Sequence, residues 1–82
     1  MEDFTTYSVE QFNSLIGINI KHNDTFNEVM VKIENVNQSY FYTSMNKNDV
    51  LQAIEDEREV AKALNLNLIF IDEIGIYIAL YE

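Results

Sequence analysis

The most constraining feature of the sequence is LNLIFIDEIGIYIALYE at residues 66–82, because it predicts a β-hairpin. Two runs of apolar and aromatic residues flank a four-residue turn. Asp72 at the first turn position and Gly75 at the fourth fit a type I turn followed by a bulge, with Gly75 in the left-handed region. Both faces of the hairpin are apolar, which is typical of central strands or of strands covered on both sides. A partner protein or a second copy of the chain is a candidate for the second cover.

A short helix is predicted at residues 6–17, TYSVEQFNSLIG. Ser8 is a good N-cap residue, and Gln11 three residues later completes a capping box. Gly17 fits the left-handed residue just past a helix end. The apolar stripe of this helix consists of Val9, Phe12, Leu15 and Ile16.

Three antiparallel strands are predicted between residues 18 and 44. Apolar and polar residues alternate at 18–21, and β-branched residues occupy every second position at 29–34, where they alternate with Met30, Lys32 and Glu34. A period of two indicates half-buried strands. Asn23 and Asp24 supply the turn between these two strands. A second turn at 35–38 leads to the aromatic strand SYFYTS. These strands are expected to form a meander.

A longer helix is predicted at residues 45–65. Asn46 is the favoured N-cap, with Asn48 as the alternative, and Asp49 in the first turn complements the helix dipole. Asn65 can close the other end. The element order is therefore α-β-β-β-α-β-β. This order indicates one α+β domain over residues 1–82, with a five-stranded antiparallel sheet and two helices.

The acidic run AIEDEREVAKAL of the longer helix contains outward-facing carboxylates. At about 100° per residue, Glu55 and Glu59 point away from the apolar stripe, and Asp56 lies on its flank. These three residues form either a solvated helix face or a binding surface. Pairs of Glu55 with Arg58 and of Glu59 with Lys62 would contribute only about 0.2–0.5 kcal/mol each.

Glu57 is the exception in this run, because the same geometry puts it inside the apolar stripe. An unpaired carboxylate buried there would destabilise the fold strongly. Three explanations are open. Glu57 lies at the rim of the sheet, which is the favoured explanation, or the helix bends or breaks, or the carboxylate pairs with Lys21, Lys32 or His22.

The net charge of −9, from fourteen acidic and five basic residues, disfavours several partners. Direct binding of nucleic acid requires clustered Lys and Arg, and an anionic membrane would repel this chain. The charge favours a basic protein partner, or simply high solubility. No apolar stretch reaches the ~18 residues of a membrane span, and the acidic start is not a signal peptide. A cytoplasmic protein is therefore expected.

No motif for catalysis, a metal or a cofactor accompanies these features, so the chain is not expected to be an enzyme. His22 is the only histidine, in a predicted turn where Asp24 can orient the imidazole. There is no nucleophile motif and no glycine-rich phosphate loop. Neighbouring carboxylates on a helix diverge by about 100°, which disfavours a metal site. Asp72 and Glu73 are more simply turn residues than a catalytic pair.

In size, charge and element order, the chain resembles the small acidic inhibitors encoded by phages and mobile elements. These include anti-CRISPR proteins and the uracil-DNA glycosylase inhibitor. The use of ten Ile and ten Asn is typical of a low-GC bacterium or its phage. The resemblance implies a DNA mimic that occupies the basic groove of a nucleic-acid-binding enzyme, such as a CRISPR effector. The expected partner-binding residues are Glu55, Asp56, Glu59, Asp72 and Glu73.

Two alternative functions remain open. An immunity protein would neutralise a basic toxin, such as a nuclease, by the same charge logic. A homodimeric interaction module would associate through the apolar faces of residues 68–71 and 76–81.

Overall fold

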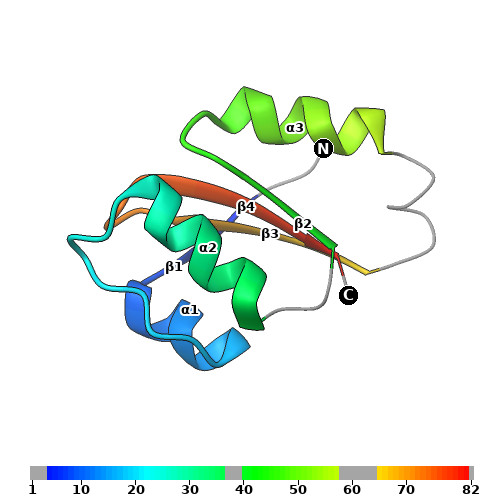
Figure 1. The fold of residues 1–82 in the computed structure, drawn as a ribbon. Helices are drawn as coiled ribbons and strands as arrows, with labels where there is room; N and C mark the ends of the chain where they lie inside the picture. Colours follow the sequence, from blue (N-terminus) through cyan, green and yellow to red (C-terminus); the bar gives the residue numbers. More distant parts are fainter. Residues whose placement is uncertain (1–3, 37–39, 58–64, 82) are drawn as a thin grey trace.

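The computed structural model describes residues 4–36, 40–57 and 65–81 of the chain, and it shows an α+β fold (Figure 1). This part of the chain contains three helices and four strands. Their order is β-α-α-β-α-β-β. The elements are β1 (Thr5–Tyr7), α1 (Val9–Ile16), α2 (Phe26–Val36), β2 (Tyr40–Ser44), α3 (Lys47–Asp56), β3 (Leu66–Ile71) and β4 (Ile76–Tyr81).

The four strands form one mixed sheet in the order β1-β3-β4-β2. The predicted hairpin is its centre, with Ile71 opposite Ile76 at the turn. Gly75 has a φ of 69°, and its N–H donates a hydrogen bond of 2.8 Å to the carbonyl of Ile71. This left-handed conformation confirms the predicted role of Gly75, because only glycine adopts it without strain. β2 pairs with β4 antiparallel, whereas β1 pairs with β3 in parallel.

Helices of the same chain cover both faces of the sheet (Figure 1). α1 and α2 pack on the face that carries Ile69 and Ile78, and α3 packs on the face that carries Leu68 and Ala79. The prediction that both faces of the hairpin are covered is therefore confirmed. The second cover is α3 itself, so the apolar faces at 68–71 and 76–81 are largely used inside the chain. A homodimer through these faces was suggested by an apolar face without a cover, and α3 provides that cover.

The prediction of a strand at residues 29–34 is wrong, because these residues belong to α2. Val29 and Ile33 are fully buried, whereas Val31 is 50% exposed. A strand would place all three side chains on one face, but a helix places the first and third together and turns the second away. The helix also has a capping box. The backbone N–H of Thr25 donates to Glu28 Oε1 at 2.9 Å, and the N–H of Glu28 donates to Thr25 Oγ1 at 3.2 Å.

The strand predicted at residues 18–21 is also absent from the structure. Ile20 is buried, as its alternation with Asn19 predicted, but its backbone is not paired with another strand. The side-chain amide of Asn13 takes the place of a strand. Asn13 Nδ2 donates to the carbonyl of Ile20 at 2.9 Å, and the N–H of Ile20 donates to Asn13 Oδ1 at 2.8 Å. One side chain therefore satisfies both polar groups of a buried residue in a loop.

The short strand β1 was not expected from the sequence. Its three residues, Thr5 to Tyr7, are exposed or half-buried and show no apolar alternation. It exists because it adds to the edge of β3, with Thr5 opposite Ile69. The fold is consequently a four-stranded mixed sheet with three helices, and the prediction of a five-stranded antiparallel sheet with two helices is wrong.

Both helices that were expected from the sequence are present, and their N-terminal caps are confirmed. Ser8 and Gln11 form the capping box of α1, and Gly17 ends that helix with a φ of 74°. The side chain of Asn46 caps α3 by accepting a hydrogen bond from the N–H of Asn48. α3 ends at Asp56, earlier than expected, and the remainder of the predicted helix up to residue 64 lies outside the described residues.

Candidate functional site

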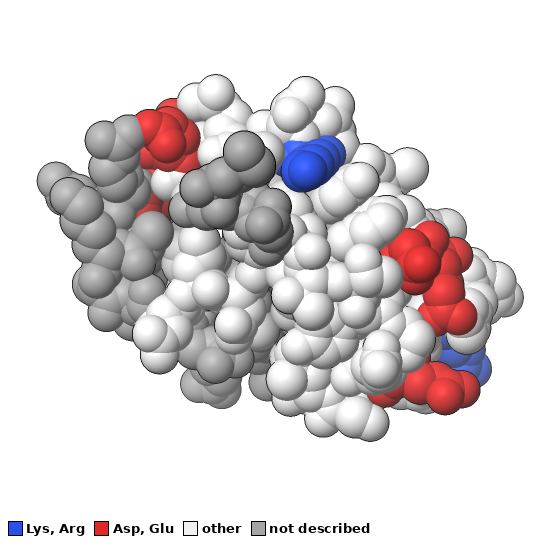
Figure 2. All heavy atoms as spheres, turned by 180° about the vertical axis from the view of Figure 1, so that it is seen from behind, with Lys and Arg blue, Asp and Glu red and all other residues white. Residues whose placement is uncertain are grey.

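The expected partner-binding residues do not form one surface in the structure. Asp72 and Glu73 lie in the β3–β4 turn, whereas Glu55 and Asp56 lie in the last turn of α3, near the opposite end of the hairpin. At about 3.3 Å per residue, a six-residue strand separates the two ends by about 17 Å. Figure 2, which shows the molecule from behind, has acidic side chains in separate groups at two ends of the visible face. Glu59 lies outside the described residues.

Glu73 has an internal structural role at the turn end. The N–H of Val9, the first residue of α1, donates to Glu73 Oε1 at 2.6 Å, and His22 Nε2 lies 3.1 Å from Glu73 Oε2. The carboxylate thus joins the hairpin turn to the N-terminus of α1, where the helix dipole favours a negative charge. The hydrogen bond from Val9, and then that of His22, lowers the pKa of the Glu73 carboxyl below its ordinary value. His22 is therefore placed beside Glu73.

Asp24, the expected partner of His22, is engaged with lysine instead. Its carboxylate forms an ion pair with Lys32 and accepts a hydrogen bond of 3.0 Å from the N–H of Lys21. The hydrogen bond from Lys32, followed by that from Lys21, lowers the pKa of Asp24. The predicted pairing of His22 with Asp24 is replaced by two separate contacts that connect loop 21–25 to the rest of the fold.

Acid is expected to destabilise the protein through these two carboxylates. Both have lower pKa values in the folded state, so their contribution is present above the unfolded-state pKa and is lost as the pH falls through the folded-state value. Urea unfolding measured from about pH 6 to about pH 3 should show this loss. Glu73→Gln should make the loss smaller, whereas Glu34→Gln, at an exposed position on α2, should leave it unchanged. An identical acid dependence in all three proteins would contradict the assigned role of Glu73.

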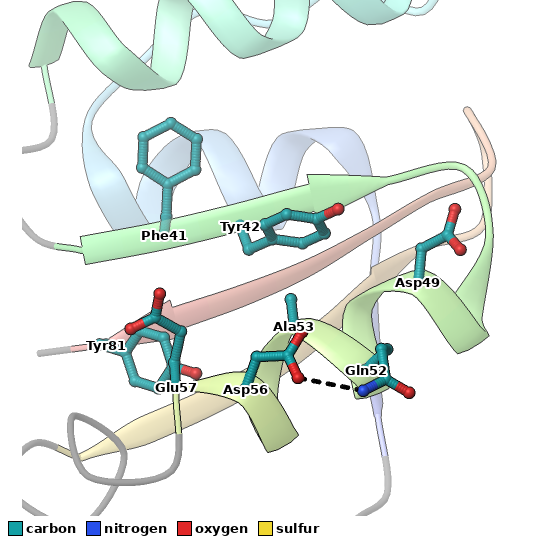
Figure 3. Close-up of a pocket in the computed structure, with 8 residues that line it drawn as sticks. All are labelled: Phe41, Tyr42, Asp49, Gln52, Ala53, Asp56, Glu57 and Tyr81. Atoms are coloured by element: carbon teal, nitrogen blue, oxygen red, sulfur yellow. Dashed lines mark hydrogen bonds between the residues drawn. The ribbon is translucent and has the colours of Figure 1, made fainter.

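A concave feature lies at the other end, between α3 and strands β2 and β4 (Figure 3). This acidic hollow has a volume of about 340 Å³. It is lined by eight residues: Phe41, Tyr42, Asp49, Gln52, Ala53, Asp56, Glu57 and Tyr81. Three of them are carboxylates and three are aromatic, and no Lys, Arg or His is present among the described lining residues.

The helix and the two strands position the lining side chains in a regular way. Tyr42 lies opposite Ala79 in the sheet, on the face that α3 covers, and Tyr81 is on the same face of β4. Asp49 and Asp56 are seven residues apart on α3, so they lie two turns apart on one side of the helix. The hollow therefore has an aromatic floor from the sheet and an acidic wall from α3.

Two of the three carboxylates are held by neutral side chains. Ser44 Oγ donates to Asp49 Oδ2 at 3.2 Å, and Gln52 Nε2 donates to Asp56 Oδ1 at 3.1 Å, the contact drawn in Figure 3. Each of these contacts involves one oxygen of the carboxylate. Glu57 is a half-buried residue, and its carboxylate has no ion pair or hydrogen bond with another described residue. None of these contacts supplies a positive charge.

The position of Glu57 answers the question raised by the acidic run. α3 ends at Asp56, and Glu57 is its C-cap residue. The side chain lies beside Tyr81 at the end of β4, at the rim of the sheet, which is the explanation favoured from the sequence (Figure 3). The end of the helix at this point also agrees with the alternative that the helix breaks. Pairing with Lys32 or His22 does not occur, because these residues contact Asp24 and Glu73.

The end of α3 adds to the negative potential of the hollow. The last carbonyl groups of a helix carry a partial negative charge, which basic residues in the last turn normally offset. α3 has no basic residue in its last turn, and three consecutive acids occupy positions 55–57. Without a nearby cation, these acids destabilise the C-terminal end of α3. A cation bound beside them would stabilise it.

Of the expected partner-binding residues only Asp56 lines the hollow, although the sequence also placed Glu57 at the rim of the sheet. Asp49, Gln52, Ala53 and Asp56 follow the spacing i, i+3, i+4, i+7, which places them on one side of a helix, and this signal was available. The position of Tyr42 and Tyr81 next to α3 depends on the pairing of β2 with β4, which no local sequence pattern specifies.

The described residues give little support for other kinds of functional site. No group of three or more His, Asp or Glu residues there could hold a metal ion. No helix among the same residues is long and apolar enough to cross a membrane. Comparison with protein-family models, with curated proteins and with solved structures finds no match to this chain.

Proposed function

We propose that the protein binds a basic surface of another protein through the acidic hollow, and that it inhibits this partner. The observation that carries the proposal is the concentration of negative charge at one concave site. Asp49, Asp56 and Glu57 line it together with the C-terminal end of α3, and no described basic residue neutralises it. With a net charge of −9, the chain would also be steered towards positive partners over a longer range.

The proposed partner is a nucleic-acid-binding enzyme of host defence, such as a CRISPR effector. Enzymes of this kind bind phosphates with clustered Lys and Arg, which is the chemistry that carboxylates complement. The profile of a small acidic phage inhibitor supports this choice. Glu73 is not part of the proposed binding surface, because its carboxylate contacts Val9 and His22. Of the five residues that the sequence suggested, the hollow retains Asp56, and it adds Asp49 and Glu57.

Charge reversal at the hollow is expected to abolish capture of the partner. The immobilised protein should capture it from host lysate at low salt and release it at high salt, because exposed charges are screened. Asp56→Lys combined with Glu57→Lys should reduce capture about tenfold or more. The variant should remain folded, since cations at a helix C-terminus contribute about 0.3–1 kcal/mol of stability.

The matched control is Asp72→Lys combined with Glu34→Lys, which changes the net charge equally at exposed positions elsewhere. The control should still capture the partner. Equal loss in both double variants would show that only total charge matters, and no loss in either would refute the acidic-decoy hypothesis. The captured protein, once purified, should lose nucleic-acid binding when this chain is added. A secreted or self-encoded toxin as the captured protein would instead support the immunity alternative.

A further inference from the structure

We propose that the acidic hollow is a pocket for one arginine side chain of the partner protein, and that it prefers arginine to lysine. This inference rests on the proposed function and makes it more specific. It concerns the recognition chemistry at the hollow, where charge, shape and aromatic surface occur together.

The size of the hollow fits a side chain. Its volume of about 340 Å³ is at the lower end of the range of roughly 300–1,000 Å³ for pockets that hold small ligands. The site is partly open to solvent. A side chain that projects from another protein can therefore enter it.

The charge of the lining favours a cation as the occupant. Asp49 and Asp56 each use one oxygen in a contact with a neutral side chain, and Glu57 is half-buried with no polar partner among the described residues. A neutral or acidic group in the hollow would leave these carboxylates without a counter-charge, at the negative end of α3. A bound cation would remove that repulsion and gain charge-assisted hydrogen bonds.

The aromatic floor distinguishes arginine from lysine. A guanidinium group is planar and stacks on the face of an aromatic ring, while its edges donate paired hydrogen bonds to carboxylates. Tyr42 and Tyr81 both line the hollow, with the ring of Tyr42 along β2 and Tyr81 next to Glu57 (Figure 3). An ammonium group is more strongly hydrated and does not combine stacking with a two-point contact. The walls of the hollow thus match the guanidinium shape.

The exposure of Tyr42 is consistent with a ring that is available to a partner. Its side chain is 43% exposed, although it lies on the face that α3 covers. Tyr81 is only 2% exposed and forms the base of the site. An arginine stacked on Tyr42 would cover apolar ring surface and contact the carboxylates of α3 at the same time.

The test is a titration of the whole, isotope-labelled protein with three blocked tripeptides that differ only in the central residue: arginine, lysine or citrulline. Citrulline has the arginine shape without the charge. Amide signals of Tyr42, Gln52, Ala53 and Glu57 should shift with the arginine peptide, with a dissociation constant in the millimolar range. The lysine peptide should bind roughly fivefold to tenfold more weakly, and citrulline should cause no shifts at these residues.

Variants at Tyr42 separate stacking from charge. Tyr42→Leu should reduce arginine affinity to the level of lysine, and Tyr42→Phe should retain the preference because it keeps the ring. Asp56→Asn with Glu57→Gln should remove binding of both cationic peptides. Thermal unfolding of each variant will show whether it remains folded, which is expected because Tyr42 and the two acids are not in the core.

Equal affinity for arginine and lysine, shifts centred on the turn at 72–75, or no shifts at roughly tens of millimolar peptide would overturn the arginine pocket. These results are separable from failure of the proposed function. If charge reversal at residues 56 and 57 abolishes partner capture while arginine shows no preference, the function stands and the arginine inference fails. If the arginine peptide binds the hollow but charge reversal leaves capture unchanged, the partner binds elsewhere. Tighter binding of free agmatine than of the arginine peptide would indicate a small guanidinium ligand and would also overturn a protein arginine as the occupant.

Discussion

Ile33→Ala is expected to lower the free energy of unfolding by about 2–5 kcal/mol, while Val31→Ala changes it by less than about 0.5 kcal/mol. Ile33 is fully buried against the sheet, so removing its side chain leaves a cavity in the larger core. Val31 is 50% exposed on the other side of α2. Alanine also has a higher helix propensity than valine, which offsets the small loss of contact.

Urea unfolding followed by circular dichroism will measure this difference. In a domain of this size, 1 kcal/mol corresponds to about 4–8 °C in Tm, so the two variants should be well separated. If Ile33→Ala does not fold, Ile33→Val should still cost about 0.5–1.5 kcal/mol. Equal destabilisation by Val31→Ala and Ile33→Ala would contradict the helix, because it would place both side chains on one buried face as in a strand.

Asn13→Ala is expected to destabilise the protein by about 2–3 kcal/mol. The Asn13 amide makes two hydrogen bonds to Ile20, one to its N–H and one to its carbonyl. Ile20 is buried, so both backbone groups would lose their partners in a place that water reaches poorly. The cost is expected to exceed that of an ordinary surface hydrogen bond for this reason.

Asn19→Ala is the matched control, because it removes an exposed asparagine from the same loop. Its stability should remain within about 0.5 kcal/mol of the parent. Asn13→Asp keeps an acceptor for the Ile20 N–H but removes the donor to the carbonyl, so it should also be destabilised. A neutral effect of Asn13→Ala would mean that the loop around Ile20 has other partners for its backbone.

The acidic end of α3 illustrates a conflict between local stability and binding. Acidic residues at a helix C-terminus are unfavourable for the helix, and here they line the hollow that we assign to a basic partner. Proteins tolerate such local costs at functional sites when the rest of the fold supplies enough stability. The exposed ring of Tyr42 is also suited to an interface, because Tyr is enriched there.

Local signals predicted the N-terminal caps and the left-handed glycines, whereas α3 ends at Asp56 and not near Asn65 as expected. Ser8 with Gln11 and Asn46 were both recognised as caps, and Gly17 and Gly75 were recognised as left-handed residues. These features depend on backbone geometry within four residues, so the sequence contains all the information they need. Thr25 and Glu28 formed the same kind of signal at the start of α2 and were overlooked in favour of the alternation at 29–34.

That alternation was ambiguous, and only packing resolves it. Val29, Val31 and Ile33 fit a period of two, but Phe26, Val29, Met30 and Ile33 fit a helical stripe equally well. The competition is decided by which arrangement buries the apolar side chains against the central hairpin. The helix does so with Val29 and Ile33, and it leaves Val31 in solvent.

By itself, the sequence determined the central hairpin, the two caps, the α+β class and a strongly negative charge, because each follows from local geometry or composition. The tertiary structure decided the sheet order, the parallel edge strand β1, the helix α2 and the acidic hollow. These features arise from contacts between residues far apart in the chain. The pairing of Thr5 with Ile69, and the meeting of Tyr42 and Tyr81 with α3, are stabilised by burial that no short segment can provide alone.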